Sequence, residues 1–300
     1  MAETFTETLH AGYAQTMTLK GKMLVDEQSP FQNVKFFDTE RNGRVLVLDG
    51  NVQTTTRDHA AYSEMLTHLP MFEHGKVKSV LIVGGGDLAI AAEALKHKGV
   101  TRVVLAEIDP VVIERSRELF ADINKKAFKD KRMDIQVVDA FDYLARPETI
   151  GAFDLVIADR PDPIGPGAIL FADDFYKRIR AALRPGGFAV FQTGVPFYQP
   201  EELTDTLKQL GRLFKAAGAY LTVVPTYIGG FMALTWVSAD GAVLGDARKA
   251  KKIEKAFAAA GVKTEYYTPA IHQAAFALPA WIAKLVRRSG SDQYRTVSPR

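Results

Sequence analysis

The chain has 300 residues, of which 47% are hydrophobic and 24% charged, a composition typical of a globular protein with a substantial core. It contains no cysteine, which excludes thiol nucleophiles, redox-active cysteine pairs and Cys-rich zinc sites. Residues 1–240 contain 27 basic and 31 acidic side chains, whereas residues 241–300 contain 11 and 4, so the net charge of +3 comes from the C-terminal part. The mildly acidic body favours a small cationic substrate over nucleic acid.

The first sixty residues predict a small β domain. Asp49-Gly50 is a strong hairpin turn signal, and it follows an apolar segment of strand character. We expect strands over residues 16–25, 33–38, 43–48 and 53–56. A helical apolar pattern follows over residues 59–72. We therefore predict an antiparallel β domain over residues 1–60 and a catalytic domain with a C-terminal helical extension over residues 61–300.

From residue 79 onward, apolar strand segments alternate with amphipathic helices. We expect strands over residues 79–83, 102–107, 134–138, 153–159, 188–192, 220–224 and 231–237, and helices over residues 90–97, 110–120, 173–183 and 200–217. This order is typical of an α/β fold with a doubly wound, methyltransferase-like, seven-stranded and mostly parallel sheet. The last two strands should form an antiparallel edge.

Three further segments bear on location and partners. Residues 216–239 carry no charge and are long enough to span a bilayer, but Pro225, Gly229 and Gly230 interrupt them, so we expect two buried strands and no membrane segment. Residues 246–261 predict an amphipathic helix whose basic face is solvated, in preference to a nucleic-acid contact. The acidic and polar residues 1–4 do not resemble a secretory signal, so we expect a cytoplasmic location.

Candidate ligand-binding residues follow three strands of the predicted sheet. The glycines at 84–86 permit a tight turn that a ligand can approach closely, and Asp87 directly after them disfavours a pyrophosphate and suits an ammonium group. Glu107 ends the next strand, where an acid commonly accepts both ribose hydroxyls, whereas Asp109 is better interpreted as a helix N-cap. Asp139 could accept the exocyclic amine of adenine. This pattern predicts a nucleoside site without phosphates, as for S-adenosyl compounds.

The strongest signal is a pair of carboxylates just past the fourth strand of the sheet. Asp159 and Asp162 stand three residues apart in a Pro- and Gly-rich segment that extends to Gly167. A helix cap or a turn explains one such acid, but not a pair over the sheet crevice. Two carboxylates there can bind the ammonium of a polyamine and accept the proton of its attacking amine.

These motifs together resemble the spermidine synthases, the polyamine aminopropyltransferases, and are most similar to their proteobacterial branch. The similarity extends over nearly the whole chain, from residue 7 to residue 279. Its most specific blocks are residues 43–50 (GRVLVLDG), 52–55, 57–58, Tyr62 with residues 64–65, residues 84–87, 107–109, Asp159 with residues 162–167, and residues 225–227 and 269–272.

The resemblance implies transfer of the aminopropyl group of decarboxylated S-adenosylmethionine to putrescine, giving spermidine and methylthioadenosine without a metal or prosthetic group. It implies that Asp159 is the catalytic acid position and that Tyr62 and Tyr227 position the attacking nitrogen. Asp162, Asp87 and Ser63 match amine-binding positions. The implied donor-binding residues are Gln32, Gln53, Gly84, Gly86, Asp87, Glu107, Asp139, Ala140 and Pro166. A homodimer or homotetramer is implied as well.

Elementary chemistry supports this assignment. Putrescine is a dication at neutral pH, and an ammonium nitrogen has no lone pair, so attack requires a base such as Asp159. Asp87 and Asp159 would also disfavour the carboxylate of ordinary S-adenosylmethionine. His68 and His74 lack a convincing third ligand, so we expect no metal site.

The chain departs from the family's usual residues at several positions. Ser63 after Tyr62, Arg160-Pro161 between the two acids and Ala168 in place of Glu bear on the acceptor, whereas Leu88-Ala89 after the glycines and Ala140 in place of Gly bear on the donor. An arginine beside a dication is unfavourable unless it points outward. Cadaverine, agmatine or spermidine are therefore alternative acceptors, and a methyltransferase or a non-catalytic homologue is a more distant alternative.

Overall fold

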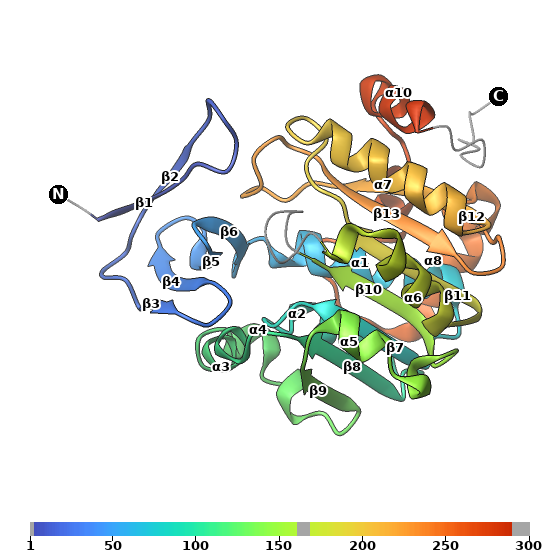
Figure 1. Ribbon diagram of the computed structural model, residues 1–300, viewed down its shortest axis with the longest axis horizontal. Helices are drawn as coiled ribbons and strands as arrows, with labels where there is room; N and C mark the ends of the chain where they lie inside the picture. The colour runs from blue at the N-terminus through green and yellow to red at the C-terminus, as the bar shows by residue number, and fades with distance from the viewer. Residues whose placement is uncertain (1–2, 161–168, 290–300) are drawn as a thin grey trace.

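The computed structural model describes residues 3–160 and 169–289 (Figure 1). Two of the predicted site residues, Asp162 and Pro166, lie outside the described residues, as do Pro161 and Ala168. In the described part of the chain, no helix is both long enough and apolar enough to cross a membrane.

The N-terminal part forms two antiparallel sheets (Figure 1). A two-stranded sheet pairs β1 (Thr4–Glu7) with β2 (Gln15–Thr18), and a four-stranded sheet contains β3 (Val25–Gln28), β4 (Asn33–Thr39), β5 (Gly43–Leu48) and β6 (Asn51–Thr55). The prediction of one strand over residues 16–25 is wrong, because Gly21 between β2 and β3 adopts a φ of +91°. That left-handed backbone interrupts an extended chain and leaves two short strands.

The second part contains the seven-stranded sheet, and the predicted fold class is confirmed. The strands lie in the order β12-β13-β11-β10-β7-β8-β9, with β13 antiparallel to both β11 and β12. The strand bounds are β7 Ser79–Gly84, β8 Arg102–Glu107, β9 Met133–Val137, β10 Phe153–Asp159, β11 Leu183–Gln192, β12 Ala216–Thr222 and β13 Met232–Ser238. The uncharged residues 216–239 thus form two buried strands, as expected.

Helices connect these strands and cover the sheet (Figure 1). Their bounds are α1 His59–His74, α2 Ala89–Leu95, α3 Pro110–Leu119, α4 Ala121–Asn124, α5 Ala140–Leu144, α6 Asp173–Ala182, α7 Pro200–Leu213, α8 Ala250–Ala260, α9 Pro269–Ala274 and α10 Ala280–Arg288. One apolar cluster joins α1, α2 and α8 to the sheet, and a second joins α5 and α6 to it. The helix predicted over residues 200–217 is too long, because β12 already begins at Ala216.

The strand order places a ligand crevice at the centre of the sheet. From β7 the chain proceeds to β8 and β9 on one side, whereas β10 and β11 lie on the other, so the direction of winding reverses between β7 and β10. Ligands of open α/β sheets bind at the carboxyl ends of the strands at this point. Gly84 and Asp159 are direct partners in the β7/β10 register, so the glycine turn and the first acid of the predicted pair meet there.

Carboxylates at the start of α1 and along it hold distant segments of the chain. Asp58 accepts hydrogen bonds from the amide and the hydroxyl of Thr226 at 2.9 and 2.7 Å. Glu64 accepts the amides of residues 265–267 at 2.7–2.9 Å. Glu73 accepts the amide of Gly245 at 2.7 Å. These bonds connect α1 to the C-terminal half of the chain.

Candidate active site

The glycine turn lies in direct contact with the end of β10. Gly84 has a φ of +75°, and a Cβ atom there would lie 2.1 Å from the carbonyl oxygen of Asp159. Only glycine fits that position. Leu88, where the family usually has glycine, also adopts a positive φ of 61°, and its side chain is fully buried in the core. Burial of a leucine contributes about 2 kcal/mol, which offsets a left-handed strain of about 1 kcal/mol.

The larger of two adjoining cavities, about 260 Å³ in volume, extends over the carboxyl ends of β7, β8 and β9. Eight predicted donor-binding residues line it: Gln32, Gln53, Gly84, Gly86, Asp87, Glu107, Asp139 and Ala140. Sequence reasoning missed the apolar residues of its wall: Phe31, Leu46, Leu48, Ile108, Val112, Ile169 and Leu170. A largely apolar wall with five carboxylates, those of Asp49, Asp87, Glu107, Asp139 and Asp159, fits a nucleoside that carries positive charge.

Buried carboxylates make this cavity receptive to cations. Desolvation, together with the neighbouring charge of Asp159, raises the pKa of Asp87 to about 7. Desolvation also raises the pKa of Glu107 to about 7, although its carboxylate accepts the amide of Asp109 at 2.9 Å. Ionised carboxylates that are buried close together are unfavourable unless a cation binds between them. A sulfonium or ammonium ligand therefore relieves the repulsion.

Two predicted residues serve as helix caps as well. Asp109 accepts the amide of Val111 at 3.0 Å, so the predicted N-cap is confirmed. It also accepts hydrogen bonds from Ser29 and Gln32 at 2.7 and 3.0 Å, which connects α3 to the N-terminal β region. Asp139 caps α5 by accepting the amide of Phe141 at 2.8 Å.

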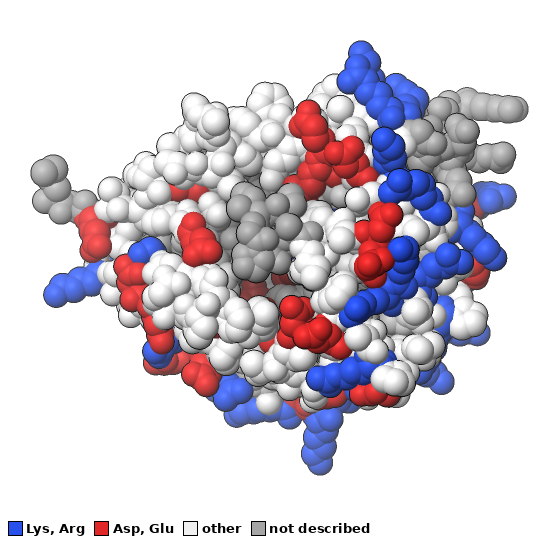
Figure 2. Space-filling model, in the orientation of Figure 1, with Lys and Arg blue, Asp and Glu red and all other residues white. Residues whose placement is uncertain are grey.

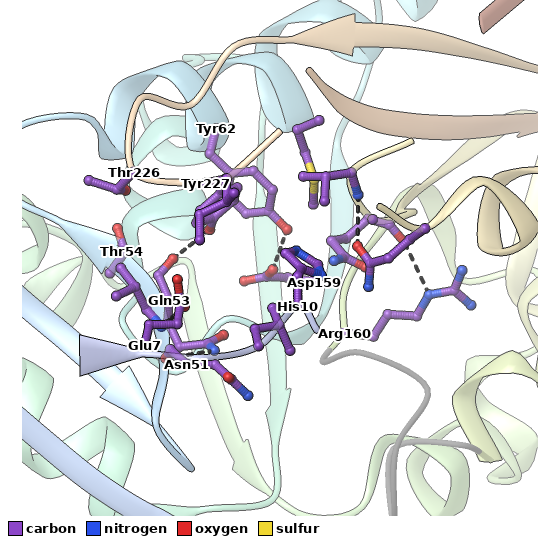
Figure 3. Close-up of a pocket in the computed structure, with 18 of the residues that line it drawn as sticks. Glu7, His10, Asn51, Gln53, Thr54, Tyr62, Asp159, Arg160, Thr226 and Tyr227 are labelled. Atoms are coloured by element: carbon purple, nitrogen blue, oxygen red, sulfur yellow. Dashed lines mark hydrogen bonds between the residues drawn. The ribbon is translucent and has the colours of Figure 1, made fainter. Parts of the chain in front are cut away.

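The smaller cavity, about 110 Å³ in volume, contains the two predicted tyrosines and Asp159 (Figure 3). The hydroxyl of Tyr62 donates to Asp159 Oδ1 at 2.5 Å, and the two tyrosine rings meet edge to face at 5.8 Å. Desolvation raises the pKa of Asp159 to about 6, even though the hydrogen bond from Tyr62 acts to lower it. Burial holds the pKa of Tyr62 well above its ordinary value, so this phenol is a neutral donor.

Both cavities share the same junction. Gln53, Asp87, Asp159 and Arg160 belong to the walls of each. A molecule in the larger cavity and a molecule in the smaller cavity would therefore meet beside Asp159. This arrangement suits the attack of one ligand on the other, with a carboxylate at the point of contact.

The N-terminal β region contributes to the smaller cavity. Glu7, Leu9 and His10 line it, together with Asn51, Gln53 and Thr54 from β6 (Figure 3). Glu7 Oε1 accepts the amide of Val52 at 2.7 Å. Sequence reasoning missed these side chains except Gln53, although Glu7 and His10 fall in the segment that resembles the family.

Tyr227 is held from several sides. Its hydroxyl donates to the carbonyl of Gln53. Thr226, the preceding residue, is bound on one side by Asp58 and on the other by Gln15, whose amide group donates to the Thr226 carbonyl at 2.9 Å. The hairpin of β1 and β2 is therefore in direct contact with the segment that carries a predicted catalytic tyrosine.

Ser63 does not join the other predicted site residues. It is buried, and its hydroxyl donates to the carbonyl of His59 at 2.9 Å, within α1. It is absent from the described walls of both cavities. Its predicted contact with the amine finds no support in this geometry.

One cluster of possible metal ligands occurs in the described part of the chain, and it lies outside both cavity walls. It consists of Glu64, His68 and Glu93. His68 Nε2 and Glu93 are already hydrogen-bonded to each other at 2.9 Å, and Lys96 binds Glu93 at 2.6 Å. Glu64 accepts three backbone amides. The cluster's own hydrogen bonds and its lysine fit a structural network better than a cation site.

Comparisons with known proteins show which family the chain resembles. The family model for the spermine/spermidine synthase domain matches residues 59–246, and the model for the spermidine synthase tetramerisation domain matches residues 4–56. A polyamine aminopropyltransferase of Ruegeria sp. (strain TM1040) is 44% identical over 285 residues, covering 93% of this chain and 97% of the relative. Polyamine aminopropyltransferase 1 of Pseudomonas aeruginosa is 38% identical, with 96% and 99% covered.

Solved structures give the same result. A spermidine synthase in complex with the transition state analogue AdoDATO has a TM-score of 0.87 and 30% identity, with 95% of each chain covered. The spermidine synthase of Thermotoga maritima has a TM-score of 0.85 and 30% identity, with 95% of this chain and 94% of that chain covered. The chain therefore belongs to the spermidine synthase family, the polyamine aminopropyltransferases.

Proposed function

We propose that this protein transfers the aminopropyl group of decarboxylated S-adenosylmethionine to putrescine, which gives spermidine and methylthioadenosine. The observation that carries the proposal is the pair of adjoining cavities that meet at Asp159. The larger cavity, with Glu107 and Asp139, takes the nucleoside. The smaller cavity, with Tyr62 and Tyr227, takes the diamine.

In the proposed reaction a primary amine of putrescine attacks the methylene carbon attached to the donor's sulfonium. The new C–N bond forms as the C–S bond breaks, and the bonding electron pair goes to sulfur. Asp159 takes the proton from the attacking nitrogen, directly or through water, and Tyr62 orients the Asp159 carboxylate. Because the sulfonium is already a good leaving group, most of the remaining catalysis is in-line positioning.

Charge complementarity supports the choice of substrates. Asp87 at the junction of the cavities suits the ammonium of the aminopropyl group, and ordinary S-adenosylmethionine would bring an additional carboxylate toward it. On the face shown in Figure 2, acidic side chains flank the middle, whereas basic ones gather toward the edge near α7 and α10. Acidic side chains on one face of a protein attract a dication toward that face.

The proposal includes the remaining expectations from the sequence. Asp162 and Pro166, outside the described residues, are proposed to bind the amine and the donor through the family resemblance alone. The enzyme is proposed to act in the cytoplasm as a homodimer or homotetramer, without a metal or prosthetic group. The match of residues 4–56 to a tetramerisation domain supports an oligomer.

A product assay by mass spectrometry tests this function. Purified protein is incubated with decarboxylated S-adenosylmethionine and, separately, putrescine, cadaverine, agmatine or spermidine, with ordinary S-adenosylmethionine in parallel. We expect equal amounts of spermidine and methylthioadenosine with putrescine. Preference for another amine would move the proposal to that acceptor. Methyl transfer, or no product with any amine, would refute it.

A further inference from the structure

We infer that Arg160 is a positioning residue, which fixes Asp159 and joins the walls of the two cavities without contacting the amine. Arg160 directly follows Asp159 at the end of β10, and it is only 2% exposed. In Figure 3 its side chain is directed away from Tyr62 and Asp159. Its guanidinium therefore does not lie beside the bound dication, the unfavourable arrangement that its position next to Asp159 in the sequence suggested.

Three aromatic rings surround the guanidinium. Its carbon atom lies 3.6 Å from the ring centre of Phe171, 5.5 Å from that of Tyr176 and 5.4 Å from that of Phe191. No carboxylate of the described residues lies within 4.0 Å of it. Among the described residues, ring faces and hydrogen-bond acceptors surround the positive charge, an environment that suits the weakly hydrated guanidinium better than an ammonium.

The hydrogen bonds of Arg160 reach both cavity walls. Its Nε donates to the carbonyl of Gln192 at 3.2 Å, and its Nη1 donates to the carbonyl of Leu170 and the hydroxyl of Tyr176, each at 2.7 Å. Gln192 lines the smaller cavity, whereas Leu170 lines the larger one. One side chain thus connects the end of β10 with the end of β11 and with the segment before α6.

The third nitrogen of the guanidinium separates a positioning role from direct recognition of the substrate. Arg160 Nη2 is buried and has no hydrogen-bond partner among the described residues. A substrate amine could not reach it, and an ammonium would have no lone pair to offer it. The guanidinium therefore acts on the reaction through the backbone of Asp159 and the two walls.

Loss of the hydrogen bonds that Arg160 makes should change the pKa of the Asp159 carboxyl. The charged or titratable groups that line the cavities with Asp159 include Glu7 and His10 from the N-terminal segment, Tyr62 from α1, Asp87 after β7, Glu107 at the end of β8, Arg160 itself and Tyr227 after β12. Of these, Tyr62 stabilises the carboxylate by its hydrogen bond, so a carboxylate that turns away from Tyr62 becomes a weaker acid. Arg160→Lys keeps the charge but cannot reproduce the planar set of bonds.

The test compares Arg160→Lys, Arg160→Met and Tyr176→Phe with the wild type. Tyr176→Phe removes only the hydroxyl that Arg160 binds. Arg132→Met is the matched control, because Arg132 donates to the carbonyls of Leu95, His97 and Val100, outside both cavities. We measure kcat, KM for both substrates, and the Asp159 titration by carboxyl NMR, with Asp159→Asn identifying the signal.

We expect kcat to fall at least about tenfold in both Arg160 variants and about fivefold or less in Tyr176→Phe, with both KM values nearly unchanged. The Asp159 titration should move to higher pH in all three, but not in Arg132→Met. If Arg160→Lys kept the wild-type kcat and the wild-type pKa of Asp159, the inference would be overturned, since a positive charge at position 160 would then be enough to support the site. A changed amine preference with an unchanged titration would also overturn it, in favour of direct recognition.

The activity readout of this inference rests on the proposed function, but the titration does not. A wild-type protein inactive with every amine would refute the proposed function. The shift of the Asp159 titration between wild type and Arg160→Lys would still decide whether Arg160 positions Asp159. If Arg160→Met fails to fold, the lysine and phenylalanine variants decide it.

Discussion

The proposed donor half and the proposed acceptor half of the site, which are the larger and the smaller cavity, are built differently. The carboxylates of the donor cavity follow β7, β8 and β9, which are adjacent strands of one sheet. The acceptor cavity instead collects side chains from the N-terminal segment, β6, α1 and the connections after β11 and β12. The Gln15 to Thr226 bond on this side joins residues 211 positions apart. The donor half is thus a product of local strand and turn structure, whereas the acceptor half requires correct tertiary docking.

Asp159→Asn should have the largest effect on turnover, because Asp159 lies where the two cavities meet. We expect kcat to fall by roughly 10³-fold, because the amide cannot accept the proton of the attacking amine. Binding of methylthioadenosine, measured by calorimetry, should largely survive. Asp134→Asn, an exposed β9 carboxylate paired with Arg102, is the control and should keep wild-type turnover. Near wild-type turnover of Asp159→Asn would remove Asp159 from the mechanism.

Glu107→Gln should affect the donor half alone. Loss of a charged acceptor for the ribose hydroxyls costs about 1.5–3 kcal/mol, so the donor KM should rise about 10- to 100-fold. The KM for the amine should stay near that of the wild type. Steady-state kinetics with each substrate varied in turn separates the two effects, and an unchanged donor KM would contradict the ribose role.

Asp87→Asn should raise the stability of the folded protein at neutral to alkaline pH, because it removes a buried carboxylate from the junction of the two cavities. Folding raises the pKa of Asp87 from 3.8 to about 7, so between these values the folded state binds more protons than the unfolded chain. The contribution of Asp87 to stability therefore falls as the pH rises through this window, and the penalty is complete above pH 7.

Without ligand, the Tm of Asp87→Asn should exceed that of the wild type by at least about 2 °C at pH 8, with little difference at pH 4. Thermal unfolding across this pH range measures the effect. A variant less stable than the wild type at pH 8 would show that Asp87 is already compensated.

Gln15→Ala should have the smallest effect. It tests whether a contact from the N-terminal hairpin supports the acceptor cavity. It removes the hydrogen bond from Gln15 to the carbonyl of Thr226, worth about 1 kcal/mol, and also the hydrogen bond from Gln15 to the carboxylate of Glu7, which lines the same cavity. The KM for the amine should rise about fivefold, and the donor KM should not change. The control is Gln28→Ala, whose side chain binds only the carbonyl of Ser29. Equal effects on both substrates would argue against a local role.

This contrast also explains what the sequence could predict. The bounds predicted for β5, β8 and β10 match the structure, and the acids after β7, β8 and β9 line the larger cavity as expected. These features depend on local patterns of apolar residues, glycines and caps. Gln15 and Glu7 could not be placed in the same way, because their roles arise from contacts with distant segments. The β1 strand was missed as well, since it is short and partly exposed.

Arg160 shows a different limit. Its sequence neighbours predict that Arg160 lies next to a bound dication, and only the structure shows that three aromatic rings surround its guanidinium. The rings that surround it come from Phe171, Tyr176 and Phe191, none of which has a recognisable motif. Side-chain direction at one position thus decides whether an unusual residue changes specificity or supports the site.

The three amides that Glu64 accepts have a consequence for how the protein is made. They belong to residues 201–203 positions later in the chain, so α1 reaches its final environment only after nearly all of the polypeptide has been synthesised. A nascent or truncated chain that ends before residue 265 would bury Glu64 without its partners. Such a chain should stay bound to chaperones or aggregate, because the helix that carries Tyr62 cannot complete its packing before residues 265–267 have been synthesised.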